Sequence, residues 1–206
     1  MDPQNDAEEQ PGQPGQDRSE KRCSASQIDS EKANRGNEHT GKEGWIMAKI
    51  NVEGKSLEER MQIAQDTAKG YFRQGLNCTE CVMRTFLDMH DTGLPEDVMC
   101  MATGFGGGIG HTKNICGAIT GAVLALGMVK GRRDPFEKEE MKDRIHQLQG
   151  EIYPVFGSMI KEIEAEYGTL ICRELSDPFG DFDGKARKKN CMQMIGYCAA
   201  IAEKYV

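Results

Sequence analysis

Cysteines are the residues of this sequence whose spacing points most directly to chemistry. Cys78 and Cys81 form a CxxC pair, and Cys116, Cys172 and Cys191 follow as single thiols. At the start of a helix, free backbone amides and the helix dipole favour a thiolate, which redox catalysis and metal ligation both require. A thioredoxin interpretation would need a strand before the CxxC, and a zinc-ribbon interpretation would need a second CxxC. The sequence offers neither. The alternative is a pair of buried thiols on a core face.

Two further positions carry candidate chemistry. Cys116 is expected in the first turn of an apolar helix behind Asn114 as the cap, where small neighbours leave room for another sulfur or a cofactor. His111 directly follows the glycine-rich stretch 104–110 and could bind a metal or shuttle protons, although a lone loop histidine is more often solvated. No strand precedes this loop and no Gly-Lys-Ser/Thr ends it, which argues against a phosphate site. We expect its glycines to allow close backbone approach around Cys116.

The elements that must position these residues are helices. Apolar residues recur at three- and four-residue steps, and Ser56 and Asn77 are good N-caps. Helices are expected over residues 57–74, 77–93, 96–103, 115–129, 135–167 with a bend at Pro154, 172–175 and 185–204. The 115–129 helix is apolar almost all round, so it should be buried within one chain or between two. The sequence predicts an all-α bundle of about five to six helices around this Gly/Ala-rich central helix.

Composition limits the partners. The 206 residues carry a net charge of −7, without the basic footprint that nucleic acids or anionic membranes require. A basic run at residues 185–189 precedes Cys191, where cations favour a thiolate, although such a run more often forms a solvated helix face. No apolar stretch is long enough to span a bilayer, and no secretory signal is evident. We expect a cytoplasmic protein, in which cysteines more often mark metal or redox chemistry than structural disulfides.

Residues 1–46 differ from the rest of the chain in composition. Only eight of them are apolar, too few to offset the entropy of ordering, so a disordered tail is expected. The alternative is that they are not translated. Residues 42–44 can be back-translated into AAG-GAG-GGN, which resembles a bacterial ribosome-binding site upstream of a start at Met47. In either case residues 47–206 are expected to form a single helical domain.

The order of the motifs resembles a known family. The resemblance to the C_GCAxxG_C_C family of redox-active proteins covers nearly all of residues 57–205 and rests on Asn77-Cys78, the glycine-rich loop, the Cys116–Gly121 element, Cys172 and Cys191. It implies that the family's four cysteines are Cys78, Cys116, Cys172 and Cys191, and that Cys81, Cys100 and Cys198 are not among them; Cys100 is expected in the core. Some related domains are fused to haem-binding regions of split-Soret type cytochromes. This chain has no CxxCH motif, so covalent haem is not expected.

Three functions compete within this resemblance. In the first, which we rank highest, the four cysteines bind one iron–sulfur cluster or another thiophilic metal such as zinc, with Cys81 and His111 as further candidate ligands. In the second, Cys78 and Cys116 form a reversible disulfide and the other two cysteines a resolving or relay pair, as in a metal-free thiol–disulfide oxidoreductase. In the third, the chain is a structural module that binds a partner. We expect a redox partner protein, no nucleic acid and no membrane insertion, and the oligomeric state, including a homodimer, stays open.

Overall fold

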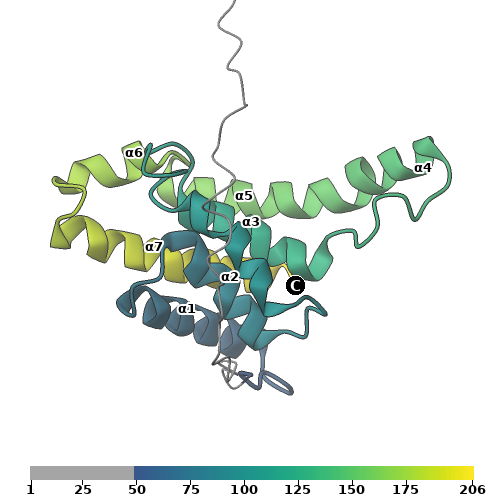
Figure 1. Cartoon of the computed structure of the whole chain (residues 1–206), viewed down its shortest axis with the longest axis horizontal. Helices are drawn as coiled ribbons and strands as arrows, with labels where there is room; N and C mark the ends of the chain where they lie inside the picture. Colours follow the sequence, from purple (N-terminus) through teal and green to yellow (C-terminus); the bar gives the residue numbers. More distant parts are fainter. Residues whose placement is uncertain (1–48) are drawn as a thin grey trace, which may run out of the picture. The chain divides into compact units, whose positions relative to one another are not determined.

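Helices make up almost all of the regular structure. The computed structural model describes residues 49–206, so the predicted tail over residues 1–46 and the alternative start at Met47 lie outside the described residues. No strand occurs within residues 49–206, where Ile115 and Ile171 form an isolated β-bridge. The all-α prediction is confirmed (Figure 1). The elements are α1 (Leu57–Arg73), α2 (Cys78–Met89), η1 (Glu96–Met101), η2 (Thr103–Phe105), α3 (Gly117–Lys130), α4 (Met141–His146), η3 (Gln147–Ile152), α5 (Tyr153–Tyr167), α6 (Cys172–Ser176), η4 (Asp177–Phe179) and α7 (Lys185–Lys204).

Side chains fix the starts of the first two helices. The Ser56 hydroxyl accepts a hydrogen bond from the Glu59 N–H, and the Glu59 carboxylate accepts one from the Ser56 N–H at 2.8 Å. Asn77 and Glu80 form the same reciprocal capping box at the start of α2. These bonds satisfy amides that the first helical turn leaves unpaired. Both predicted caps are therefore confirmed, and the second of them places Cys78 at the first position of α2.

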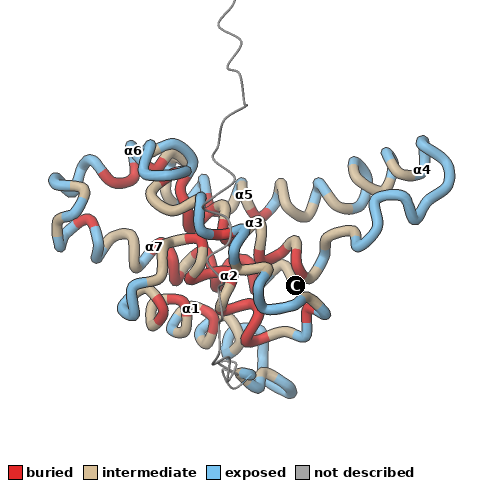
Figure 2. Tube along the Cα trace, viewed as in Figure 1, coloured by how far each residue is buried: buried red, intermediate tan, exposed pale blue. Residues whose placement is uncertain are grey.

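The central helix is α3, as predicted. It packs against α2, α5 and α7, while α1 packs against α7 (Figure 1). Buried residues gather where these helices meet (Figure 2). A methyl group on Gly121 would lie 3.0 Å from Cβ of Val82, so this glycine allows α3 to approach α2 closely. None of the helices within residues 49–206 is long and apolar enough to cross a membrane.

Three predicted elements differ from the structure. The 96–103 helix is replaced by the 3₁₀ turns η1 and η2, and α3 begins at Gly117 because the preceding residues pair with the segment before α6. The long 135–167 helix begins only at Met141. Its predicted bend is a π-helical segment, η3, which ends just before Pro154. Proline has no N–H and its ring crowds the preceding turn. The wider π turn accommodates Pro154 without breaking the helix.

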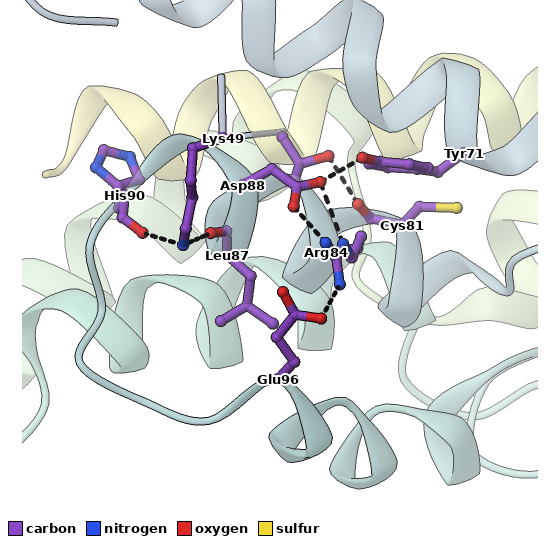
Figure 3. Close-up of polar contacts among 9 residues, drawn as sticks. Lys49, Tyr71, Cys81, Arg84, Leu87, Asp88, His90 and Glu96 are labelled. Atoms are coloured by element: carbon purple, nitrogen blue, oxygen red, sulfur yellow. Dashed lines mark hydrogen bonds and ion pairs between the residues drawn. The ribbon is translucent and has the colours of Figure 1, made fainter. Parts of the chain in front are cut away.

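A buried polar network joins α1 to α2 (Figure 3). The Asp88 carboxylate accepts a hydrogen bond from Nη2 of Arg84 at 2.6 Å and another from the Tyr71 hydroxyl. Burial and the adjacent Asp88 raise the pKa of Tyr71 to about 12, so its hydroxyl stays a donor at neutral pH. Nη1 of Arg84 also lies 3.4 Å from the Glu96 carboxylate, and the Lys49 ammonium donates to the Leu87 carbonyl. The network holds the start of the described chain and η1 against α2.

A second buried charge predicts a measurable contribution to stability. The fully buried Glu203 carboxylate lies 2.6 Å from Nε2 of His90 and 3.4 Å from Nε of Arg60. Glu203→Gln removes the charge that both partners face, so we expect the free energy of unfolding to fall by about 3 kcal/mol. Denaturant unfolding measures the loss. The control is Glu162→Gln, whose surface pair with Lys204 should contribute less than about 1 kcal/mol. Equal losses in the two variants would contradict the assignment.

Candidate functional site

The four cysteines that the family resemblance implies come from four different helices. Cys78 and Cys172 are the first residues of α2 and α6, and Cys116 is the N-cap of α3. Cys191 lies further along, on the second turn of α7. Cys116 therefore occupies the cap position that the sequence assigned to Asn114. The Asn114 carbonyl instead accepts a hydrogen bond from the Cys172 N–H at 2.6 Å.

These four cysteines lie close enough to act on one another through their charges. Charge on Cys191 raises the pKa of both Cys78 and Cys172, and charge on Cys78 raises that of Cys116. Cys172 also acts on Cys78 and Cys116. All four thiols are free. We call Cys78, Cys116, Cys172 and Cys191 the four-cysteine cluster.

Backbone pairing holds two members of the cluster together. The Cys116 N–H donates to the Leu170 carbonyl at 3.0 Å, and the Arg173 N–H donates to the Lys113 carbonyl at 3.0 Å. These bonds run on either side of the Ile115–Ile171 bridge and align the entrance of α3 with that of α6. Sequence periodicity contains no sign of this pairing, because it joins two short loop segments more than fifty residues apart.

The glycine-rich loop packs against the cluster. Gly107, Gly108 and Gly110 have positive φ, and so do the non-glycine residues Ile109 and His111. A methyl group on Gly108 would lie 2.7 Å from Cβ of Cys172. The loop thus approaches Cys172, and it also approaches the residue after Cys116, since a Cβ on Gly117 would lie 3.0 Å from the Phe105 carbonyl oxygen.

Most loop amides are already engaged, which argues against an anion cradle. The N–H groups of residues 109–114 donate to carbonyls of residues 104–109 within the same loop. The Gly107 N–H points to the Cys78 sulfur and lowers its pKa. An anion-binding loop needs several free amides directed at one point. The loop instead forms one wall of the cluster by packing against Cys172.

A family model decides the affiliation of this chain. It matches residues 76–205 and is described as "Putative redox-active protein (C_GCAxxG_C_C)". The chain belongs to the C_GCAxxG_C_C family. No curated protein and no solved structure matches it significantly. Seven cysteines fall inside the matched range, and the four-cysteine cluster is the set that the family resemblance implies.

The other three cysteines of this C_GCAxxG_C_C protein have different surroundings. Cys81 is fully buried, and its thiol donates to the Leu76 carbonyl at 3.6 Å. Cys198 is fully buried too, behind Cys116 and Cys78. Cys100 is exposed on η1, so its predicted place in the core was wrong. The CxxC spacing thus brings one thiol, Cys78, to the site and buries the other.

Burial dominates the electrostatics of the cluster. Burial and the charge of Cys191 raise the pKa of Cys78 to about 11, despite the Gly107 N–H and Arg187, which lower it. Burial and the charge of Cys78 raise the pKa of Cys116 to about 12, despite the N–H groups of Ala118 and Ile119. The predicted stabilisation of thiolates by amides at helix starts is present, but burial outweighs it. The free-energy cost of removing a thiolate from water exceeds the stabilisation that these amides provide.

One residue of the basic run of α7, Arg187, contacts the four-cysteine cluster. The Arg187 side chain is buried, and its Nη1 donates to the Cys191 sulfur at 3.5 Å. Its guanidinium stacks on the Phe182 ring at 3.8 Å, and its Nε donates to the Phe182 carbonyl. Lys185, Lys188 and Lys189 stay exposed. Sequence reasoning did not separate Arg187 from these lysines, although its position four residues before Cys191 places the two on one helix face.

A cavity of about 340 Å³ opens beside Cys78. His111 and Phe182 line it and stack edge to face, with ring centroids 5.2 Å apart. Arg187 also borders the cavity, whereas Cys116 and Cys172 are buried behind it. A molecule entering this cavity reaches Cys78 before any other member of the cluster. His111 is exposed and adjoins the cavity.

Metal ligation has less geometric support than the cysteine count suggests. Within the part of the chain that the structure describes, no three His, Cys, Asp or Glu side chains are arranged to hold a metal ion. This holds for the four-cysteine cluster and for Cys81 and His111, the two further candidate ligands. Four thiols nevertheless suit a soft metal in chemistry and number.

Proposed function

We propose that this protein transfers electrons by thiol–disulfide exchange within the four-cysteine cluster. The observation that carries the proposal is the convergence of four free thiols from four helices, with the buried Arg187 guanidinium donating to the Cys191 sulfur and acting on Cys78 and Cys172. Cys78 is the entry thiol because it lines the cavity. Cys191 is the resolving thiol, since its charge has the largest effect of any thiol on Cys78 and Arg187 holds its sulfur.

The proposed reaction moves two electrons from the protein to a disulfide partner. The Cys78 thiolate attacks one sulfur of the partner, a mixed disulfide forms, and the partner's other sulfur leaves as a thiolate that takes up a proton. The Cys191 thiolate then attacks the Cys78 sulfur of the mixed disulfide. A Cys78–Cys191 disulfide forms, the second partner thiol is released, and the partner is fully reduced. Cys116 and Cys172, each next to a member of this pair, can pass the disulfide inward by the same exchange.

Disulfide mapping tests this proposal. Reduced protein is treated with a small dialkyl disulfide, remaining thiols are alkylated, and peptides are analysed by mass spectrometry. We expect a mass loss of about 2 Da before alkylation and a cross-link between the peptides of Cys78 and Cys191. A cluster that remains fully alkylatable, or a first cross-link that involves Cys100, would contradict the proposal.

A metal centre is the second candidate, favoured by a different observation. Burial raises the pKa values of Cys78, Cys116 and Cys172, and a soft cation bound among these thiols would stabilise their thiolates. Cys78, Cys116, Cys172 and Cys191 would hold an iron–sulfur cluster or zinc, and iron would supply one-electron transfer.

Iron and zinc are therefore measured per chain in protein purified without oxygen. Near-stoichiometric iron would replace thiol–disulfide exchange as the proposed function, and zinc alone would indicate a structural or sensing site. Metal-free protein that forms the Cys78–Cys191 disulfide would support our first proposal.

A further inference from the structure

The segment before α5 projects away from the other helices. In Figure 1, α4 and η3 continue the line of α5 outward as a single rod beyond the helices that pack around α3. Large apolar side chains on this rod are open to solvent: 66% of Met141 and 44% of Ile145 are exposed. A polar sequence would suit a solvated rod. These side chains instead indicate that another surface covers them.

The apolar residues of the rod continue a stripe that enters the body. Met141, Ile145, Leu148 and Ile152 are four, three and four residues apart, and Phe156 and Ile160 continue at four-residue steps. Such steps keep residues on one side of a helix. Phe156 and Ile160 line cavities on the outer side of α3. The rod and the cavities are therefore parts of one continuous apolar surface.

The cavities themselves form a groove along α3. One has a volume of about 440 Å³ and the other of about 300 Å³, and both are lined by Val123 and Leu124. The α3 residues that line them fall in two adjacent rows at four-residue intervals: Ile119, Val123 and Gly127, and Thr120, Leu124 and Met128. The groove follows one face of α3, the helix whose sequence is apolar almost all round. The chain covers its other faces but leaves this one open.

Length and charge match the rod to this groove. The rod, residues 141–152, is about 18 Å long at 1.5 Å per residue, and α3 is about 21 Å long. Arg132 and Arg133 lie at one end of the groove. Around the start of the rod the acids Glu137, Glu139, Glu140 and Asp143 outnumber the bases Lys138, Lys142 and Arg144. Arg133 donates to the carbonyls of Thr92 and Met128, whereas no ion pair of residues 49–206 uses Arg132 or any of these four acids.

We propose that two copies of this chain form an antiparallel dimer in which the rod of each copy lies in the α3 groove of the other. One chain carries both a convex apolar rod and a concave apolar groove, with opposite charges beside them. A two-fold axis brings rod to groove twice, so a second copy satisfies both surfaces at once. It also covers the open face of α3. The four-cysteine cluster takes no part in this interface, so the proposal does not depend on the redox function.

Sedimentation equilibrium of the whole chain tests the dimer. We expect a particle of twice the 22.9 kDa chain mass at about 10 µM. Ile145→Glu places a charge in each of two symmetric grooves, so the dimer Kd should rise by about 100-fold or more. Arg132→Glu should weaken the dimer by about 10-fold through loss of charge complementarity.

The control variant is Phe179→Glu, which alters another exposed apolar side chain, on η4, away from both surfaces. It should leave the Kd unchanged. A monomeric wild-type chain up to about 100 µM would overturn the proposal. So would an Ile145→Glu variant as dimeric as the wild type, or a Phe179→Glu variant that dissociates equally. Circular dichroism of each variant shows whether the helices remain, and Ile145 is exposed enough that its substitution should not unfold the chain.

Discussion

Cys78→Ser is expected to abolish formation of a disulfide within the four-cysteine cluster when this C_GCAxxG_C_C protein is treated with a small disulfide. Cys78 lines the cavity, while Cys116 and Cys172 are buried behind it, so an incoming disulfide meets the Cys78 sulfur first. Serine has a similar shape but forms no disulfide, and the rate should fall by about 1,000-fold or more. Disulfide mapping against time measures the rate, because a total thiol count would include the exposed Cys100.

Cys100→Ser is the matched control for this variant. Cys100 is an exposed cysteine on η1 and lies outside the four-cysteine cluster. Its replacement should leave the rate of Cys78–Cys191 disulfide formation unchanged. Denaturant unfolding of both variants shows whether a lost rate reflects chemistry or misfolding. Oxidation of Cys78→Ser at the wild-type rate would contradict the role of entry thiol.

The electrostatics of Cys78 also fix the pH dependence of this reaction. Only the thiolate reacts, and burial and Cys191 raise the pKa of Cys78 to about 11. Alkylation of Cys78 should therefore accelerate about tenfold per pH unit up to about pH 11, whereas an ordinary cysteine levels off near pH 8.5. The folded-state pKa exceeds the unfolded value of 9.0. The contribution of Cys78 to the stability of reduced protein is thus fully present below about pH 9 and is lost as the pH rises toward 11. A plateau of the alkylation rate near pH 8.5 would contradict this.

The parts of the fold that depend on local interactions could be predicted from the sequence. Ser56 and Asn77 cap α1 and α2 through bonds to residues three positions away, which a sequence pattern contains in full. The buried position of α3 follows from its composition, because an almost wholly apolar helix must be covered. The start of α3 could not be predicted in this way. It depends on pairing between Ile115 and Ile171, which no local pattern records.

The candidate site was predictable in its residue types but not in its electrostatics. The order of the cysteines identified the family, but spacing alone could not show that Cys81 faces the core while Cys191 lies beside Cys78. Helix starts suggested thiolates, and only the packed structure shows that burial outweighs them. Arg187 differs from its neighbouring lysines because its flat guanidinium stacks on Phe182 and still reaches the Cys191 sulfur. That contact depends on the path of the chain between α6 and α7.

Gly108→Ala is expected to be the most damaging single-methyl change in the site. Gly108 has φ of +75°, and an added Cβ would lie 2.7 Å from Cβ of Cys172 and 2.7 Å from the Asn114 nitrogen. Both obstacles are close to the backbone, and the pairing of Asn114 with Cys172 holds them in place. We expect the free energy of unfolding to fall by about 3 kcal/mol or more, as overpacking adds to the left-handed strain. Denaturant unfolding measures the loss.

Gly110→Ala separates the contact from the backbone strain. Gly110 lies in the same loop with φ of +59°, but an added Cβ would meet nothing within 4 Å. Its replacement should cost only the left-handed strain, about 1 kcal/mol, and should leave the Cys78–Cys191 disulfide in place. Because Gly108→Ala pushes on Cys172, it should also slow the passage of that disulfide to Cys172 and Cys116, which mapping over time detects. Equal losses of stability in the two variants would mean that the loop acts through its conformation alone and not as a wall of the four-cysteine cluster.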